Sequence, residues 1–323
     1  MIRLLAKLLT AVFLLTGVGA ATGAEVPLSP PTAAASYLVR VNGAILWSRA
    51  AQSRLPQASL AKIMTALLVL EQGKAEELVT VSNTAARETG TRIGLRQGER
   101  LRTKDLLAAT LLGSANDACR ALADHLGAGE FRFVARMNSR AQELGLANTH
   151  FNNACGHDHP LQYSTAYDLA VLAEFAMSHR PFAELARTVS LRIETADGLR
   201  AFNLENKNEL VGRYQGAIGV KTGTTPKAGK CLVALAERGE NRVMLVMLKA
   251  PERWWQAVAI LDRAFAAAAE RHSPPDGHTD ALFSPRLTGE SRPLFNNTGF
   301  RVKPGMTKEG SDDFYEFVKS NDQ

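Results

Sequence analysis

The stretch Ser59-Leu60-Ala61-Lys62-Ile63-Met64-Thr65-Ala66-Leu67-Leu68-Val69-Leu70 decides how this chain folds. No Pro or Gly interrupts residues 58–72, so we expect a helix with Ser59 in its first turn. At a spacing of three, Ser59 and Lys62 share one face, with Cβ atoms roughly 5–6 Å apart. An amine there can take the proton of a hydroxyl, and the positive end of the helix favours developing negative charge. By itself, the pattern is explained more simply by a helix cap and a solvated lysine.

Residues 1–24 have the features of a secretory signal peptide. Arg3 and Lys7 precede an apolar run over residues 8–19, and small residues follow it. This run is shorter than the roughly 20 residues of a spanning helix, and an uncleaved anchor is the alternative. We expect residues 25–35, rich in Pro and Ala, to be a linker. The folded part is then exported to the periplasm or cell envelope, with membrane association only through an uncleaved N-terminal segment.

Charge and cysteine content exclude several classes of protein. Removing Arg3 and Lys7 leaves 36 basic against 32 acidic residues, a net charge of +4. No basic block or stacking aromatic pattern points to nucleic acid. The three cysteines are too few for a disulfide scaffold in a chain of this length, and one pair could be bridged in an oxidising compartment; they are Cys119, Cys155 and Cys231. None has a metal-ligand spacing, so we expect no metal site and no cofactor.

Two β-rich regions flank a long helical region. Residues 36–48, with Asn42-Gly43 at the turn, predict a hairpin. Residues from about 62 to 185 are mostly helical, broken by a polar loop over residues 149–163. The four segments with helical apolar spacing are residues 105–112, 117–126, 131–144 and 166–177.

The chain returns to strands after residue 185. Residues 189–200, with Asp197-Gly198, predict a second hairpin, and three strands and a helix follow it. The strands are expected over residues 217–222, 231–237 and 242–248, and the helix over about 252–271. This order predicts an α+β fold within the α/β class, with an antiparallel sheet from both chain ends and a helical subdomain between them. We expect one domain over residues 36–271 and an irregular tail over 272–323.

Two further motifs change the interpretation of Ser59. Ser114-Ala115-Asn116 lies between two predicted helices, and Lys221-Thr222-Gly223-Thr224 ends a predicted strand. Each is weak alone, because a helix cap and a solvated strand end explain them equally well. Ser-x-x-Lys, a Ser-x-Asn triplet and Lys-Thr-Gly in this order are together the signature of β-lactamases and penicillin-binding proteins.

Residues 36–270 resemble the serine D-alanyl-D-alanine carboxypeptidases, the low-molecular-mass penicillin-binding proteins of bacterial peptidoglycan. The similarity is carried by residues 58–66, 114–118, 144–151, 163–170 and 219–229. It implies a β-lactamase/transpeptidase-like fold. The chain departs from the family at Ile218, where an aspartate is usual. It also departs after residue 271, where many members carry a second domain and an amphipathic membrane helix.

The predicted catalytic residues are Ser59, Lys62 and Ser114. Ser59 attacks the carbonyl between two D-alanines and forms an acyl-enzyme. A free lysine is a poor base at neutral pH, but burial and the second cation Lys221 push Lys62 toward its neutral form. Ser114 passes a proton from Lys62 to the leaving amine, because a hydroxyl both donates and accepts.

The predicted substrate-binding residues are Asn116, Lys221, Thr222, Gly223 and Thr224. Asn116 holds the peptide chain of the substrate, while Lys221 and the two threonine hydroxyls bind its terminal carboxylate. The resemblance implies an oxyanion hole made of the backbone N–H groups of Ser59 and Thr224.

The expected activity is a D,D-carboxypeptidase acting on stem peptides that end in D-Ala-D-Ala, with β-lactams as inhibitors. A D,D-endopeptidase is the first alternative, since it shares the motifs. A β-lactamase needs a Glu-x-x-x-Asn pattern, which is absent between Asn116 and Lys221. An inactive scaffold is disfavoured by the intact motifs. We expect His150, His157 and His159 to be solvated, and Trp254 and Trp255 to serve packing.

Overall fold

The computed structural model describes residues 34–272. The predicted signal peptide, the linker up to residue 33 and the tail from residue 273 lie outside these residues. Ala34 is buried, and the Ala35 N–H donates to the Lys249 carbonyl at 3.2 Å. These two residues, which the sequence assigns to the linker, therefore pack against the folded domain.

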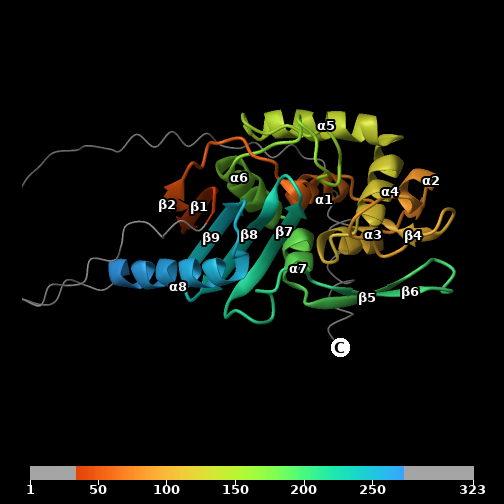
Figure 1. Cartoon of the computed structure of the whole chain (residues 1–323). Coiled ribbons are helices and arrows are strands. Elements are labelled where there is room, and N and C mark those ends of the chain that lie inside the picture. The colour runs from red at the N-terminus through yellow and green to blue at the C-terminus, as the bar shows by residue number, and fades with distance from the viewer. Residues whose placement is uncertain (1–33, 273–323) are drawn as a thin grey trace, which may run out of the picture.

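A five-stranded antiparallel sheet made from both ends of the chain forms the frame of the molecule (Figure 1). Its strands are β1 (Ser36–Val41), β2 (Ala44–Arg49), β7 (Ala217–Thr225), β8 (Gly229–Arg238) and β9 (Asn241–Leu248), in the order β2-β1-β9-β8-β7. Leu38 of β1 pairs with Val246 of β9, so the N-terminal hairpin joins the C-terminal strands directly. The sheet predicted from the sequence is confirmed.

The helical region lies between the two halves of the sheet in sequence. Its elements are the 3₁₀ turn η1 (Ala58–Ala61) and the helices α1 (Lys62–Glu71), α2 (Asn83–Ala86), α3 (Thr103–Leu111), α4 (Asn116–Gly127), α5 (Glu130–Glu143), α6 (Ala166–Met177) and α7 (Arg180–Arg187). Every residue from Lys62 to Leu70 is buried. A helix buried all round shows a continuous apolar run instead of a one-sided stripe, which explains the opening stretch of sequence.

Two short strand pairs complete the structure. β3 (Leu78–Thr80) and β4 (Arg100–Arg102) pair inside the helical region and were not predicted. Three residues are too few to show the alternation that identifies a strand. β5 (Ser190–Glu194) and β6 (Ala201–Glu205) form the predicted second hairpin, which runs five residues beyond the expected end.

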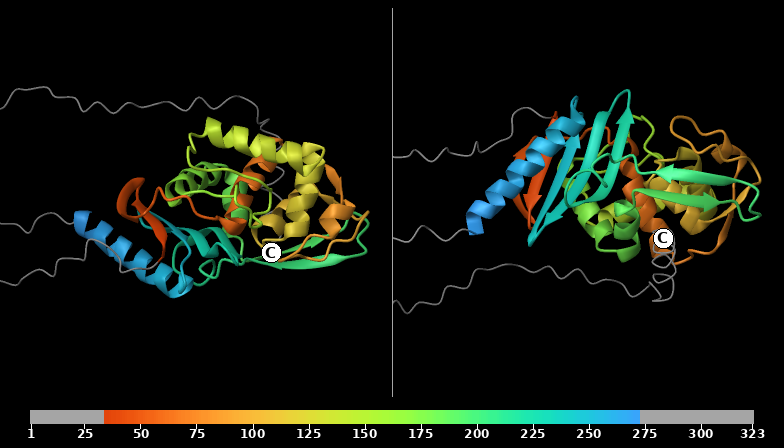
Figure 2. Two further views of the ribbon diagram at one scale, coloured as in Figure 1. Left: turned by 45° about the horizontal axis from the view of Figure 1, so that its top comes forward. Right: turned by 90° about the horizontal axis from the view of Figure 1, so that it is seen from below.

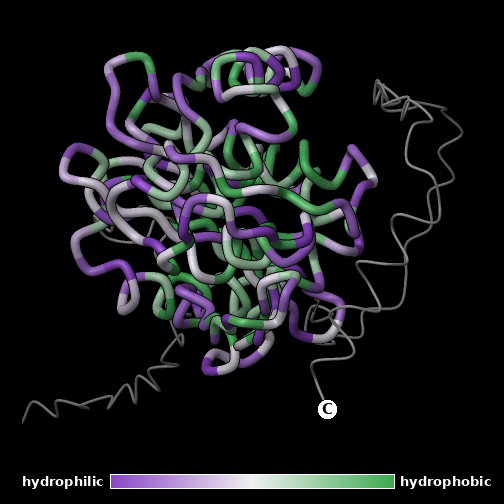
Figure 3. Tube along the Cα trace, turned by 90° about the vertical axis from the view of Figure 1, so that its right-hand side faces the viewer, coloured by the Kyte–Doolittle hydropathy of each residue, from purple (hydrophilic) through white to green (hydrophobic). Residues whose placement is uncertain are grey.

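Each face of the sheet packs against its own apolar core. The last helix, α8 (Arg253–His272), covers one face, and the helical region with α6 covers the other (Figure 2). Along β9, Met244 and Val246 face the helical core, while Val243 and Leu245 face the core beneath α8. Hydrophobic segments accordingly gather inside the molecule, and hydrophilic ones follow the outer loops (Figure 3). Strands buried on both faces read as continuous apolar runs.

The two tryptophans of α8 differ from the expectation. Trp254 is partly buried and stacks with the Arg253 guanidinium, 4.3 Å from the ring centre. Trp255, however, is 80% exposed, so its predicted packing role is wrong. Consecutive residues on a helix point about 100° apart, and only one of the two can face the sheet.

Candidate active site

Ser59 lies in η1, one turn before the start of α1, and is partly exposed. Two glycines allow other segments to approach its backbone. A Cβ on Gly156 would lie 2.8 Å from the Ser59 nitrogen, and one on Gly223 would lie 3.0 Å from it. Ala58, just before Ser59, has φ +50°, a left-handed conformation that costs a non-glycine residue free energy. Ser59 is thus held between two chain segments at a sharp turn.

Lys62 is fully buried directly behind Ser59. Its Nζ lies 3.0 Å from Ser59 Oγ, 2.6 Å from Asn116 Oδ1 and 2.6 Å from the Cys155 carbonyl oxygen. Burial holds the pKa of Lys62 well below its usual range, and the positive charge of Lys221 lowers it further. The carboxylates of Glu88 and Asp117 oppose this shift without overcoming it.

The segment Ser114–Asn116 joins α3 to α4, as the sequence predicts. Ser114 is almost buried and has φ +58°. The Asn116 amide is used on both sides, since Oδ1 accepts from Lys62 and Nδ2 donates to the Thr89 carbonyl at 2.6 Å. Asn116 therefore holds Lys62 in place, and one amide hydrogen and one lone pair of Oδ1 are left for the peptide chain that it is predicted to hold.

Strand β7 forms a second wall of the site, and Lys221 on this strand is buried. Its Nζ donates to the Thr222 carbonyl at 3.1 Å. Burial, followed by the positive charge of Arg253, lowers the pKa of Lys221 to about 7. Thr224 is exposed at the end of the strand. A Cβ on Gly223 would lie 2.9 Å from Ala58 Cβ, so only glycine lets β7 lie this close to η1.

Arg253 is a residue of the site that sequence reasoning missed. It begins α8, and its Nη1 lies 3.1 Å from the Gly223 carbonyl and 3.3 Å from Thr224 Oγ1. A cation at a helix N-terminus is unfavourable to the helix dipole. A basic residue at the start of the predicted C-terminal helix was therefore the feature of the sequence that could have identified Arg253.

The loop over residues 149–163 closes the site from the third side. Cys155 supplies a carbonyl to Lys62, and its side chain forms a disulfide with Cys119 of α4, with the Cα atoms 5.9 Å apart. Cys231 is free and buried. The structure thus decides which cysteines pair. The Asp158 carboxylate accepts hydrogen bonds from Thr225 Oγ1 at 2.6 Å and from the Lys227 N–H at 3.0 Å, which ties the loop to the end of β7.

This geometry can be compared with known proteins. The profile of the D-alanyl-D-alanine carboxypeptidase family, peptidase family S11, matches residues 24–252. The chain belongs to this family of serine peptidases. The family and the fold expected from the motifs are therefore confirmed.

Individual S11 relatives cover most of the chain. The D-alanyl-D-alanine carboxypeptidase DacF of Bacillus subtilis is 36% identical over 279 residues, which are 82% of this chain and 71% of DacF. The D-alanyl-D-alanine carboxypeptidase of Streptomyces sp. K15 is 33% identical over 278 residues, 80% of this chain and 96% of its own. The solved structure of the Streptomyces K15 DD-transpeptidase matches with a TM-score of 0.69 at 33% identity, covering 74% of this chain and 99% of that one.

The S11 motifs meet in space as the sequence predicts, and His159 is exposed as expected, but the expectation for His157 fails. His157 is not simply solvated, because its Nε2 lies 2.8 Å from Glu88 Oε2. His150 Nδ1 lies 2.6 Å from the Leu161 carbonyl. Within residues 34–272, no group of three His, Cys, Asp or Glu side chains could hold a metal ion, and no helix is both long and apolar enough to span a bilayer.

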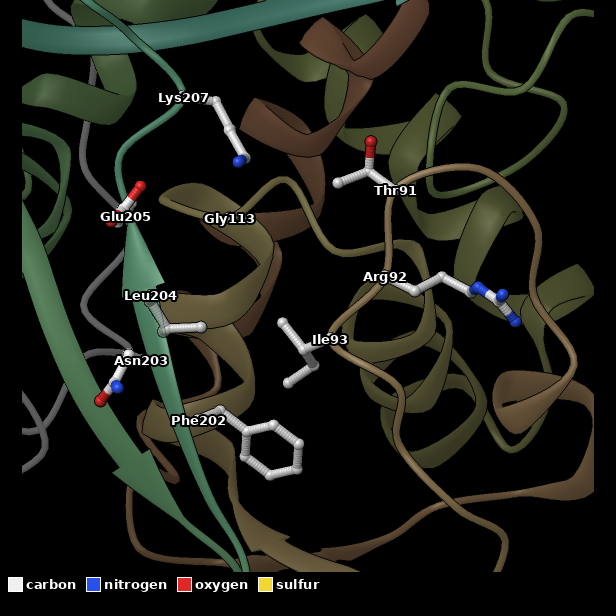
Figure 4. A pocket seen from close by; sticks show the side chains of 9 residues that line it. All are labelled: Thr91, Arg92, Ile93, Gly113, Phe202, Asn203, Leu204, Glu205 and Lys207. Carbon is white, nitrogen blue, oxygen red and sulfur yellow. The ribbon is translucent and has the colours of Figure 1, made fainter.

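A cavity of about 290 Å³ lies behind the Ser114 segment, between β6 and the loop that contains Thr91 (Figure 4). Gly113, Ile93 and Leu204 line it, and the Lys207 side chain points into it. Arg92 points away. None of the predicted catalytic residues lines this cavity.

Proposed function

We propose that this chain is an exported D,D-carboxypeptidase that removes the terminal D-alanine from peptidoglycan stem peptides through a Ser59 acyl-enzyme. The observation that carries the proposal is the buried Lys62 amine, 3.0 Å from Ser59 Oγ, in a member of the S11 family. Desolvation lowers the pKa of this amine well below its usual range and so favours the neutral state, which is the state that accepts a proton.

In the proposed mechanism, these residues carry out the acylation in two steps. Lys62 Nζ takes the Ser59 proton as Oγ attacks the carbonyl carbon between the two D-alanines. The C–N bond then breaks, and the leaving amine of D-alanine receives the proton from Lys62 by way of the Ser114 hydroxyl. Backbone N–H groups of Ser59 and Thr224 stabilise the negative oxygen of the intermediate, in keeping with the close approach of β7 to η1. Water releases the shortened peptide.

Recognition of the terminal carboxylate is assigned to the cations on the β7 wall. Lys221 lies at the Thr222 carbonyl and Arg253 at Gly223 and Thr224, and the Thr222 and Thr224 hydroxyls add neutral donors. In the free enzyme the positive charge of Arg253 disfavours the charge on Lys221 and so lowers the pKa of Lys221. A bound carboxylate removes this conflict, so the site favours a substrate with a free C-terminus.

The identity of the acyl acceptor defines a second candidate function. One similar structure is named a DD-transpeptidase, whereas the curated relatives are named carboxypeptidases. Both reactions use the same acyl-enzyme, and they differ in whether water or an amine attacks it. We favour water here, because the family profile and the curated relatives carry the carboxypeptidase name.

Labelled penicillin and a diacetyl-lysyl-D-alanyl-D-alanine peptide test the proposal on the mature protein. We expect stable penicillin labelling at Ser59 and D-alanine release, both abolished in Ser59→Ala. An added glycine or D-amino acid should not divert the product. Incorporation of the amine would indicate the transpeptidase, and fast penicillin hydrolysis a β-lactamase. Release of D-alanine by Ser59→Ala would refute the mechanism.

A further inference from the structure

The disulfide lies next to the two protein groups that hold Lys62. Cys119 is on α4, three residues after Asn116, whose Oδ1 is 2.6 Å from Lys62 Nζ. Cys155 contributes its own carbonyl oxygen to the same amine, also at 2.6 Å. The crosslink therefore joins α4 to the loop over residues 149–163, the two segments that supply the hydrogen-bond acceptors of Lys62 other than Ser59.

Apart from the approach of Cys155 Sγ to the Asn116 carbonyl at 3.6 Å, the remaining contacts of this part of the loop reach α4 only through other side chains. Thr65 Oγ1 of α1 donates to the Ala154 carbonyl at 2.7 Å, and the Ala154 N–H donates to Glu130 of α5 at 3.0 Å. His157 contacts Glu88, and both Glu88 and Glu130 pair with Arg120 of α4, at 3.2 and 2.9 Å. The direct covalent tie between the Cys155 peptide and α4 is the disulfide.

We propose that the Cys119–Cys155 disulfide is a positioning element for Lys62: it fixes the Cys155 carbonyl and Asn116 around the amine and keeps water out. This inference rests on the proposed function, in which Lys62 is the base. Both cysteines are buried, with exposed fractions of 0% and 1%. External thiols cannot reach a disulfide this deeply buried. It therefore serves as a permanent structural crosslink and not as a redox switch.

The disulfide acts on Lys62 by limiting the access of water to its amine. Without it, the Cys155 carbonyl is free to move and water gains access to Nζ, which weakens the desolvation that is the largest cause of the lowered pKa. The charged groups that act on Lys62 are Lys221 on β7, Glu88 before the Thr89 loop and Asp117 on α4. Loss of the crosslink changes none of their charges. A shift in the titration of Lys62 would therefore report the lost enclosure.

The first experiment establishes the crosslink. In denaturant without reductant, a thiol reagent should modify one of the three cysteines, Cys231. After dithiothreitol, which is oxidised to its cyclic disulfide as the protein gains two thiols, it should modify all three. Three reactive thiols without reductant, in protein exported to an oxidising compartment, would overturn the proposal.

The second experiment measures the pH profile of penicillin acylation. In Cys119→Ser and in Cys119→Ser/Cys155→Ser, we expect the acid limb of the rate to move to higher pH by about one unit, that is, about tenfold slower acylation on that limb. Cys119→Ser leaves the Cys155 side chain in place, so equal shifts in the two variants identify the crosslink as the cause. Alanine versions serve if buried serine hydroxyls prevent folding.

Ile260→Ala, in the core beneath α8, is the control for loss of stability alone. It should lower the melting temperature and leave the acid limb unchanged. An unshifted limb in the cysteine variants would overturn the positioning role, even if their melting temperatures fall. The proposed function fails in a different way, because wild-type protein would then not be acylated at all.

Discussion

At the scale of single residues, the proposed chemistry depends on a lysine, Lys62, that must be able to lose its proton. Replacing Lys62 with arginine keeps a cation near Ser59 Oγ, but a guanidinium stays protonated in proteins. We expect Lys62→Arg to reduce penicillin acylation by on the order of 10²–10⁴-fold, the usual contribution of a general base. Circular dichroism and the melting temperature check that the variant is folded. Acylation within a few-fold of wild type would mean that another group takes the Ser59 proton.

In the proposed function Lys221 has the opposite requirement, because it must be protonated to bind the carboxylate of the substrate. Its pKa of about 7 places the loss of charge in the working range. Above pH 7 the free enzyme loses this cation, so kcat/KM for a peptide with a free C-terminal carboxylate should fall by up to about tenfold per pH unit. The same peptide with a C-terminal amide should be a poorer substrate without this alkaline limb. An equal fall for both peptides would assign the limb to a group other than Lys221.

At the scale of elements, the site requires that the loop over residues 149–163 lie directly against η1. A Cβ on Gly156, which has φ +89°, would lie 2.0 Å from the Ala58 carbonyl oxygen. We expect Gly156→Ala to push the loop from Ser59 and lower the acylation rate by about tenfold or more, since small misplacements at a reacting centre are costly. The rate of labelling by penicillin measures this.

Gly145 offers a matched control for that substitution. It also has a left-handed backbone, with φ +70°, but a Cβ there meets nothing within 4 Å. Gly145→Ala should therefore carry the backbone strain, about 1 kcal/mol, without the collision. Equal losses of acylation in the two variants would show that strain, and not the approach of the loop to η1, is responsible.

At the scale of the whole molecule, one sheet joins both cores. Leu38 and Val39 are neighbours on β1 that point into opposite cores. We expect Leu38→Ala to destabilise the protein by about 2–5 kcal/mol and Val39→Ala by somewhat less. Each should shift a single unfolding transition, seen alike by tryptophan fluorescence and by far-ultraviolet circular dichroism. Two separated transitions in either variant would mean that the cores unfold independently.

Much of this architecture follows from local sequence. Asn42-Gly43 identifies the first hairpin, and the uninterrupted apolar run after Lys62 identifies a buried helix. These features depend on backbone preference and on residues three or four apart, so a single stretch contains the information. The pair β3–β4 was not predicted because strands of three residues are too short to show an alternation of apolar and polar residues.

The sequence by itself determined the family, the order of most strands and helices and the positions of Ser59, Lys62 and Lys221 in their motifs, because each motif is a few contiguous residues whose spacing a helix or strand preserves. Only the tertiary structure decided the burial and the lowered pKa of Lys62. Its acceptors come from residues 54 and 93 positions away along the chain, Asn116 and Cys155. The disulfide partner of Cys155 and the placement of Arg253 beside Thr224 were settled in the same way. Burial and contacts between distant segments arise when the chain packs, and no local pattern records them.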